Sequence, residues 1–300
     1  MSSDGRMSEP FAGYDSKVIF TQSRGEEVGD EKGNGWHGGE DDVMGRLMRS
    51  FSTGFVVVTI TMREMLMGRK LLVMGLFGIV PIIITAGLLN ASYLTLDALS
   101  NIYLNYHIQI MALLISVIYA SALINNDILS GNVVHYTTRY LSRPEYVGYR
   151  YLGYIIIAPL PTIISATVCY GIAYFGHVDG VESAGTTLYA SYIAGIILAT
   201  IAYGAFFAFL GVILSKPHIP ALLIAFIWEN LIARTYGRLP MASILYHVRA
   251  FVRNYVSIGD IARYKSYSPV NAMIVILIFS IITVVLAGYI LARKDLDVQV

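Results

Sequence analysis

The chain has 300 residues, of which 56% are hydrophobic and only 14% are charged, and its mean hydropathy is +0.61. About a quarter of the residues of a typical soluble domain are charged. This composition therefore excludes an ordinary soluble protein and predicts a polytopic membrane protein. The net charge of +1 combines an acidic N-terminal part with a basic remainder, and it gives no reason to expect nucleic-acid binding.

The first 45 residues are acidic and rich in glycine, with few apolar side chains. Such a segment buries too little apolar surface to offset the entropy that ordering would cost. We therefore predict that residues 1–45 are disordered.

Residues 46–70 show the pattern of an amphipathic helix. Four polar positions share one side of a helical wheel, and apolar residues occupy the others: Ser52, Thr59, Arg63 and Lys70. This pattern predicts a helix that lies in the membrane surface. Two alternatives stay open, a cytoplasmic extension of the first membrane span and a strand at residues 56–58.

Six apolar runs follow, and a helix needs about 20 mostly apolar residues to cross a bilayer. The runs lie at residues 71–90, 106–124, 151–176, 188–214, 219–235 and 269–292. They predict an all-α integral membrane fold, a six-span helical bundle over residues 71–296, followed by a C-terminal tail at 297–300. Pro81, Pro159 and Pro161 remove backbone donors and should kink the first and third spans.

Small residues recur at helical spacing in the fourth run, where Gly195 precedes Ala199 and Gly204 precedes Ala208. Helices approach closely in a bilayer where small residues meet. These positions predict helix packing and do not indicate a particular function.

The fifth run begins at Ile219 and offers only ten residues, ending at Trp228, before Glu229 and Asn230 interrupt it. Irregular backbone at membrane depth survives only where protein or a water-filled cavity covers it. We therefore predict a short fifth span, an extracytoplasmic re-entrant or interfacial segment over residues 229–265, and a translocation path or gate at Trp228, Glu229 and Asn230. The plainer alternative places Glu229 at the end of a short helix, facing water and hydrogen-bonded to nearby amides.

Lysines and arginines near the ends of the spans place both termini in the cytoplasm of a multi-pass cell-membrane protein. The segment between the fifth and sixth spans conflicts with this orientation, because it also carries basic residues, among them Arg249 and Arg253.

Several kinds of chemistry have no matching pattern in this chain. No Gly-Lys dipeptide occurs, so we expect no P-loop and no ATP hydrolysis by this chain, which we do not expect to be an enzyme. The six histidines lack the paired spacing of metal ligands, and no cofactor is expected. Cys169 lies in an apolar run and is interpreted as a small packing residue.

Residues 125–150 stand out as a polar segment between two apolar runs. Arginines and carboxylates alternate along it, at Asp127, Arg139, Arg143, Glu145 and Arg150. This patterning favours a surface that another protein grips, but the same arginines would equally anchor anionic lipid headgroups.

The same segment resembles the membrane subunits of ABC exporters of the type-2 permease class. Between their second and third spans these carry an acidic residue, a glycine four positions on, Thr-Arg-Pro-x-Ser-Arg, and a basic residue that opens the third span. The chain has in these places Asp127, Gly131, Thr138-Arg139-Tyr140-Leu141-Ser142-Arg143, Glu145 and Arg150. It departs from the pattern at Asp127, where Glu is usual, at Asn132, where Thr is usual, and at Tyr140, where Pro is usual.

The resemblance covers residues 50–296 and includes three further features. These are Arg63-Glu64 ahead of the first span, the break at Trp228-Glu229-Asn230, and the closing Arg293-Lys294-Asp295-Leu296. It implies a six-span half-transporter and exporter that forms a homodimer or pairs with a paralogous permease. A separate P-loop ATPase subunit would hold ATP and Mg, and the coupling residues toward it would be Asp127, Gly131, Arg139, Ser142, Arg143, Glu145 and Arg150.

Two other functions remain open from the sequence. One is a membrane scaffold that recruits partners without moving a substrate. The other is an ion-coupled transporter or channel, for which Glu229 is the candidate carboxylate. The substrate of a transporter is left open.

Overall fold

The computed structural model describes residues 38–137, 141–231, 239–258, 260–261 and 268–294. The chain divides into two units, Met1–Val43 and Met44–Val300, and the second contains the membrane-length helices. Most of the segment predicted to be disordered and the tail at 297–300 lie outside the described residues. Helix α1 (Gly38–Met67) begins eight residues before the boundary expected at residue 46, and residues 56–58 within it are helical, not a strand.

Five helical stretches are long and apolar enough to cross a membrane, and they confirm five of the six predicted spans. They are Lys70–Asn90, Leu96–Leu129, Arg143–Phe175, Val181–Ile213 and Pro269–Arg293. The predicted fifth span holds only a shorter apolar helical stretch, His218–Glu229, so a sixth crossing stays a prediction. Over the described residues the fold is helical, without strands.

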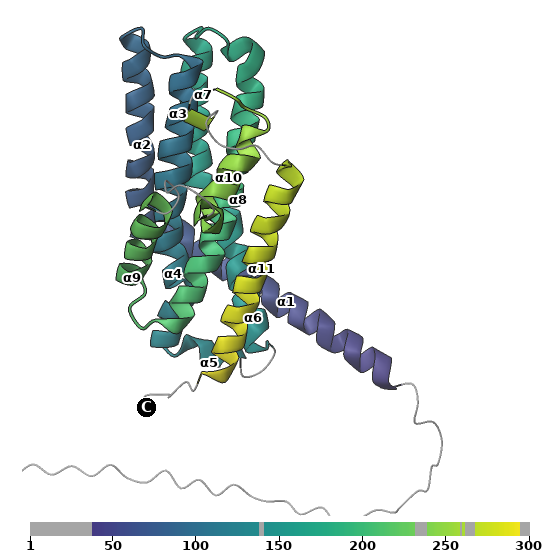
Figure 1. The fold of residues 1–300 in the computed structure, drawn as a ribbon. Helices are drawn as coiled ribbons and strands as arrows, with labels where there is room; N and C mark the ends of the chain where they lie inside the picture. The colour runs from purple at the N-terminus through teal and green to yellow at the C-terminus, as the bar shows by residue number, and fades with distance from the viewer. Residues whose placement is uncertain (1–37, 138–140, 232–238, 259, 262–267, 295–300) are drawn as a thin grey trace, which may run out of the picture. The chain divides into compact units, whose positions relative to one another are not determined.

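These five stretches run side by side in Figure 1 and are built from eight elements. They are α2 (Arg69–Asn90), α3 (Leu96–Ile102), η1 (Tyr103–Ala112), α4 (Leu113–Leu129), α6 (Arg143–Ile157), α7 (Leu160–Phe175), α8 (Val181–Ile213) and α11 (Pro269–Arg293). η1 is a π-helical stretch that joins α3 to α4 without a break.

The prolines act differently in the two spans that contain them. The kink predicted at Pro159 and Pro161 is confirmed as an interruption, because α6 ends at Ile157 and α7 begins at Leu160. Helix α2 instead continues through Pro81. The carbonyl of Phe77, four residues earlier, loses its usual amide partner there, and the Tyr106 hydroxyl donates to it at 2.8 Å.

Helix α8 lies at the centre of the bundle and packs closely against α4, whereas α2 and α11 expose most of their apolar surface. A Cβ added at Gly204 would overlap the ring of Tyr154, and one at Gly211 would overlap the carbonyl oxygen of Ser121. The predicted close packing through small residues of this helix is thereby confirmed at Gly204, with Ala208 also buried.

In the described residues between α8 and α11, where a short span and a re-entrant segment were predicted, the structure has four named short elements. They are α9 (His218–Ile224), η2 (Ala225–Leu231), η4 (Leu239–Ala242) and α10 (Ile244–Arg253). α10 packs against both α8 and α11. Figure 1 shows that α9 and α10 each extend along only part of the length of the long helices.

Candidate functional site

The polar segment at 125–150 is mostly helical. α4 ends at Leu129, a tight turn follows, and a short helix, α5 (Asn132–Thr137), begins directly after it. Gly131 in the turn has φ +72°, a left-handed conformation that costs little only for glycine. Gly131 therefore sets the direction in which the chain leaves α4, and it does so through its backbone.

Helix α6 starts with a reciprocal capping arrangement. The Ser142 amide donates to Oε2 of Glu145 at 2.8 Å, and the Glu145 amide donates to Oγ of Ser142 at 3.4 Å. Pro144 lies in the first turn, where its missing N–H is not needed. Ser142 and Glu145 thus fix the start of α6 while both remain exposed.

Arg150 lies one and a half turns farther along α6 and is almost fully buried. Its Nη2 atom lies 2.5 Å from Oδ2 of Asp127, at the end of α4. Its Nη1 atom lies 2.6 Å from Oε2 of Glu64, in α1. One guanidinium therefore holds two carboxylates that come from two other helices.

Two hydroxyl groups complete this cluster, which we call the buried charge cluster because Arg150 and Asp127 are buried, although the side chain of Glu64 is 56% exposed. The Tyr146 hydroxyl donates to Oδ2 of Asp127 at 2.5 Å and accepts from Nε of Arg150 at 3.0 Å. The Thr61 hydroxyl accepts from Nη1 of Arg150 at 3.1 Å. Charge-assisted hydrogen bonds of this kind are the strong ones in a protein interior. The cluster joins α1, α4 and α6 at the end of the bundle that carries α5.

Arg143 binds the end of another helix. Its Nη1 atom donates to the carbonyl oxygens of Leu291, Ala292 and Lys294 at 3.1, 3.3 and 2.8 Å. Carbonyls at a helix C-terminus lack intrahelical partners and carry partial negative charge, so a guanidinium stabilises them. Close packing supports the contact, because a Cβ added at Gly288 of α11 would lie 2.9 Å from Cα of Pro144.

The structure thus separates the predicted coupling residues by location. Asp127 and Arg150 are buried in the charge cluster, Arg143 caps α11, and Ser142 with Glu145 is exposed. Arg139 lies outside the described residues. Sequence reasoning missed the pairing of Arg150 with Glu64, although it singled out both positions, because the two are 86 residues apart and no spacing rule connects them.

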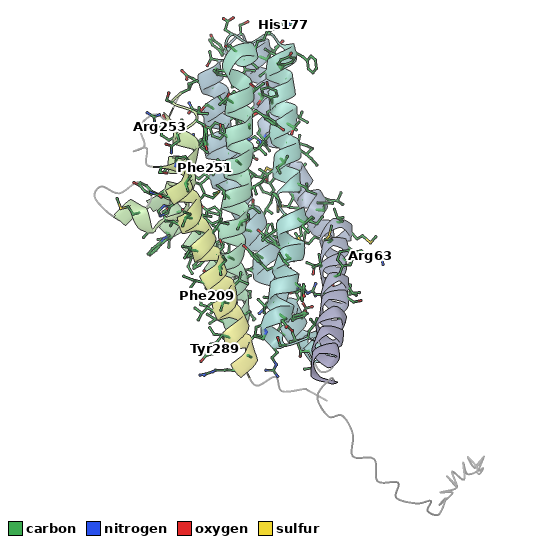
Figure 2. All side chains as sticks on the ribbon, turned by 90° about the vertical axis from the view of Figure 1, so that its right-hand side faces the viewer. Arg63, His177, Phe209, Phe251, Arg253 and Tyr289 are labelled. Carbon is green, nitrogen blue, oxygen red and sulfur yellow. The ribbon has the colours of Figure 1, made fainter. Side chains whose placement is uncertain are left out.

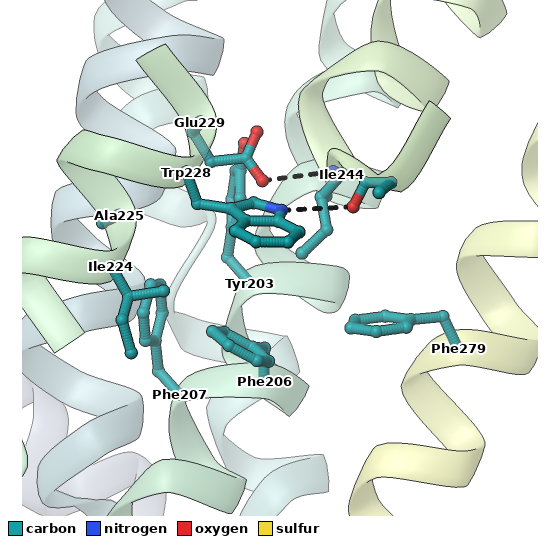
Figure 3. A pocket seen from close by; sticks show the side chains of 10 residues that line it. Tyr203, Phe206, Phe207, Ile224, Ala225, Trp228, Glu229, Ile244 and Phe279 are labelled. Carbon is teal, nitrogen blue, oxygen red and sulfur yellow. Dashed lines mark hydrogen bonds between the residues drawn. The ribbon is translucent and has the colours of Figure 1, made fainter. Parts of the chain in front are cut away.

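A cavity of about 400 Å³ lies beside the break in the fifth apolar run. Figure 3 shows its aromatic lining, with Trp228 above and the rings from α8 and α11 below. The lining is mostly apolar and includes Tyr203, Phe206, Phe207, Ile224, Trp228 and Phe279. The Trp228 indole N–H donates to the carbonyl of Ala242 at 3.2 Å, so this ring is held in place at the cavity wall.

Glu229 lies next to this cavity and caps α10. Its carboxylate accepts from the Ser243 hydroxyl at 2.6 Å and from the amides of Ile244 and Leu245 at 3.1 Å each. A carboxylate at a helix N-terminus is stabilised by the amides and by the helix dipole. The expected hydrogen bonds to nearby amides are confirmed, but the expectation that Glu229 faces water is wrong, because the side chain is buried. The Asn230 side chain lies outside the described residues.

His247 lies near this carboxylate. Its imidazole Nε2 lies 2.9 Å from the carbonyl oxygen of Met241. Burial lowers the pKa of His247 below its ordinary value, and the carbonyl of Met241 and the charge of Glu229 partly offset that effect. The helix end that Glu229 caps stabilises its carboxylate as well.

Arg249, which conflicted with the predicted orientation, is buried inside the bundle. Its Nη2 atom donates to Oε1 of Gln109 at 2.6 Å. A buried, internally bonded arginine does not count as a loop charge at the membrane surface. The conflict is therefore smaller than the sequence indicated.

Neither the family models nor the curated proteins with which the chain was compared match it.

Proposed function

We propose that this chain is the membrane-spanning subunit of an ATP-driven ABC transporter, an exporter of the type-2 permease class that works as a dimer with a separate P-loop ATPase. The buried charge cluster carries the proposal. It ties the start of α6 to α4 and α1 through Arg150, so a push on the exposed residues beside α5 is passed to three helices together. A subunit without its own nucleotide site requires a surface through which a separate ATPase can move its helices.

The distribution of charge over the bundle supports a cytoplasmic position for the segment at residues 125–150. The half of the bundle that carries α5, here called the basic end, contains these basic side chains (Figure 2): Arg63, Lys70, Arg143, Lys216, Arg293 and Lys294. The opposite end has exposed acidic residues: Asp97, Asp179 and Glu182. The positive-inside rule places the basic end in the cytoplasm.

Helix α1 has the surfaces expected of a helix at the membrane boundary. One side of α1 is a buried stripe formed by Val57, Thr61 and Met65. Thr61 packs on α6, because a Cβ added at Gly153 of α6 would lie 2.7 Å from the Cβ of Thr61. Phe55 and Met67 are exposed, as is Arg63, which lies on the side of α1 away from the long helices (Figure 2). This combination supports the interfacial placement.

The aromatic cavity beside Trp228 supports a lateral route for an apolar substrate. Cavities that bind small molecules have volumes of about 300–1,000 Å³ and mostly apolar walls, and this one falls in that range. Glu229 contributes to the route as the residue that fixes α10, because three hydrogen bonds already occupy its carboxylate. Because these hydrogen bonds occupy the carboxylate, an ion-coupled mechanism that uses Glu229 is disfavoured.

The decisive experiment is purification from native membranes, followed by a measurement of ATPase activity. We expect a stoichiometric partner with a P-loop. Glu145→Gln keeps an acceptor for the Ser142 amide but removes the exposed charge, and together with Arg139→Ala it should abolish stimulated ATPase activity while leaving membrane insertion intact. Glu182→Gln, an exposed change at the other end of the bundle, is the matched control.

Two outcomes contradict the proposal. A chain that purifies from native membranes without any P-loop subunit would instead act as a membrane scaffold. Normal stimulated ATPase activity and transport in the Glu145→Gln, Arg139→Ala variant would remove the segment at 125–150 from the coupling mechanism.

A further inference from the structure

A second cavity of about 400 Å³ lies at the basic end of the bundle. The end of α1, the start of α2 and the last turns of α4 form its walls. Its lining differs from that of the aromatic cavity, because it contains charged and polar groups: Glu64, Lys70, Tyr119, Asn126 and Asp127. Apolar residues such as Met65 and Leu123 complete the wall. A few charged and polar groups on a mostly apolar wall fix the orientation of a bound ligand.

Tyr119 provides the first specific sign of a missing partner. The residue is 7% exposed, and its hydroxyl group has no hydrogen-bond partner among the described residues. Buried hydroxyl groups are nearly always paired, and leaving one unpaired costs about 1–3 kcal/mol. Tyr119 is one of the residues that line the cavity, and a bound molecule that reaches its hydroxyl group would pair it.

The charges around the cavity provide the second sign. Glu64 and Asp127 share the single guanidinium of Arg150, so with all three ionised the buried charge cluster has one negative charge more than it has positive ones. Lys70, on the other side of the cavity, forms no ion pair with a carboxylate that the structure describes. The cavity therefore offers an excess negative charge and a separate ammonium group.

The cavity lies where lipid headgroups are expected. Lys70 is the first residue of the first membrane-length stretch. Next to it the outer surface is apolar, with Met67 and Leu72 exposed by 73% and 75% and Val73 by 48%. A lipid whose headgroup enters the cavity would lay its acyl chains along these residues of α1 and α2.

We propose that this cavity binds the headgroup of phosphatidylethanolamine. The primary ammonium would approach the carboxylates of Glu64 and Asp127 from the cavity, on the side that the Arg150 guanidinium does not occupy, and the phosphate would accept from the Tyr119 hydroxyl and from Lys70. A primary ammonium has three donors for carboxylates, whereas the quaternary ammonium of phosphatidylcholine has none. The anionic headgroup of phosphatidylglycerol has no cation for the two carboxylates. This site does not depend on the transport function proposed above.

The test uses the purified full chain in detergent, titrated with phosphatidylethanolamine, phosphatidylcholine or phosphatidylglycerol of identical acyl chains, with bound lipid counted by native mass spectrometry. We expect phosphatidylethanolamine to bind at least about tenfold more tightly than the other two. Tyr119→Phe should weaken its binding about threefold to tenfold, which corresponds to one hydrogen bond. Lys70→Gln should weaken it by a similar factor.

Tyr170→Phe is the matched control, because this hydroxyl group is also buried and unpaired among the described residues but belongs to α7. We expect it to leave lipid binding unchanged. Thermal unfolding of each variant shows that it is folded, and Lys70→Gln, at an exposed side chain, carries the test if Tyr119→Phe unfolds.

Four results would overturn the proposal. Equal binding of phosphatidylethanolamine and phosphatidylcholine would show that the ammonium is not recognised. Tighter binding of phosphatidylglycerol would show attraction to basic side chains only. Unchanged binding in both variants would place the lipid elsewhere. Competition by soluble phosphoethanolamine as strong as that by the lipid would identify a free metabolite as the ligand.

Discussion

Arg150 stabilises two carboxylates with a single guanidinium in the interior of the bundle. Removing one partner of a buried ion pair leaves uncompensated charge, which costs about 3–5 kcal/mol. We therefore expect Arg150→Met to lower the free energy of unfolding by about that amount. Unfolding in detergent, followed by circular dichroism against denaturant, measures the change.

Arg143→Met is the control for this experiment. Arg143 is only half-buried and binds carbonyl groups at the end of α11, so its loss leaves no buried charge and should cost about 1 kcal/mol. Equal effects of the two substitutions would show that the charge cluster contributes no more than an ordinary helix cap.

Glu229 contributes to stability as the cap of α10. Glu229→Gln keeps one acceptor oxygen but loses the charge and one acceptor, so we expect a loss of about 1–2 kcal/mol in the free energy of unfolding. Glu182→Gln, in the exposed first turn of α8, should lower the free energy of unfolding by no more than about 0.5 kcal/mol. A substrate-dependent loss of transport with unchanged stability would instead point to a role in the translocation path.

The sequence could identify these residues but not their partners. Charges in an apolar chain stand out from composition alone, which is why Arg150, Asp127 and Glu229 were recognised as special. Their partners depend on which helices lie side by side. Glu64 is 86 residues from Arg150, and Ser243 is 14 residues from Glu229 across a break in the helix. Hydrophobic periodicity predicts individual helices, and it does not predict contacts between residues so far apart in the sequence.

At the level of the elements, helices α4 and α8 pack so closely that the backbone of one lies against the backbone of the other. A Cβ at Gly211 would overlap the carbonyl oxygen of Ser121, which cannot move as a flexible side chain does. We expect Gly211→Ala to push the two helices apart and to lower the free energy of unfolding by about 1–3 kcal/mol.

Gly171→Ala serves as the control, and we expect it to raise the free energy of unfolding instead of lowering it. A Cβ there would meet nothing within 4 Å, and alanine is favoured over glycine inside a helix by about 1 kcal/mol. Thermal unfolding of both variants measures the difference. If Gly211→Ala were as stable as Gly171→Ala, the close approach of α4 and α8 would not exist.

The spans themselves were predictable wherever an apolar run was long enough, because a run of this length has no other way to satisfy its backbone in a bilayer. The fifth run is interrupted by Glu229, whose role the structure shows. Glu229 lies within η2, and its carboxylate caps α10 by accepting from the amides of Ile244 and Leu245.

At the level of the whole molecule, the two ends of the bundle differ in charge. His177 and Tyr289 mark these ends in Figure 2. Arg293 lies over the ring of Tyr289, 4.3 Å from its centroid, an arrangement typical of residues that anchor a helix at a membrane boundary. The sequence predicted this asymmetry from the lysines and arginines of the early loops, but it could not show that Arg249 is internal.

The orientation leads to a prediction that uses two serines at opposite ends of the bundle. Ser130 lies exposed beside Gly131, and Ser183 lies exposed in the first turn of α8. In intact cells a membrane-impermeant maleimide should label Ser183→Cys and should label Ser130→Cys only after the membrane is opened. The native Cys169 is fully buried, so the unsubstituted chain should remain unlabelled. The reverse labelling pattern would place α5 and the exposed Glu145 on the side away from nucleotide, where no ATPase could reach them.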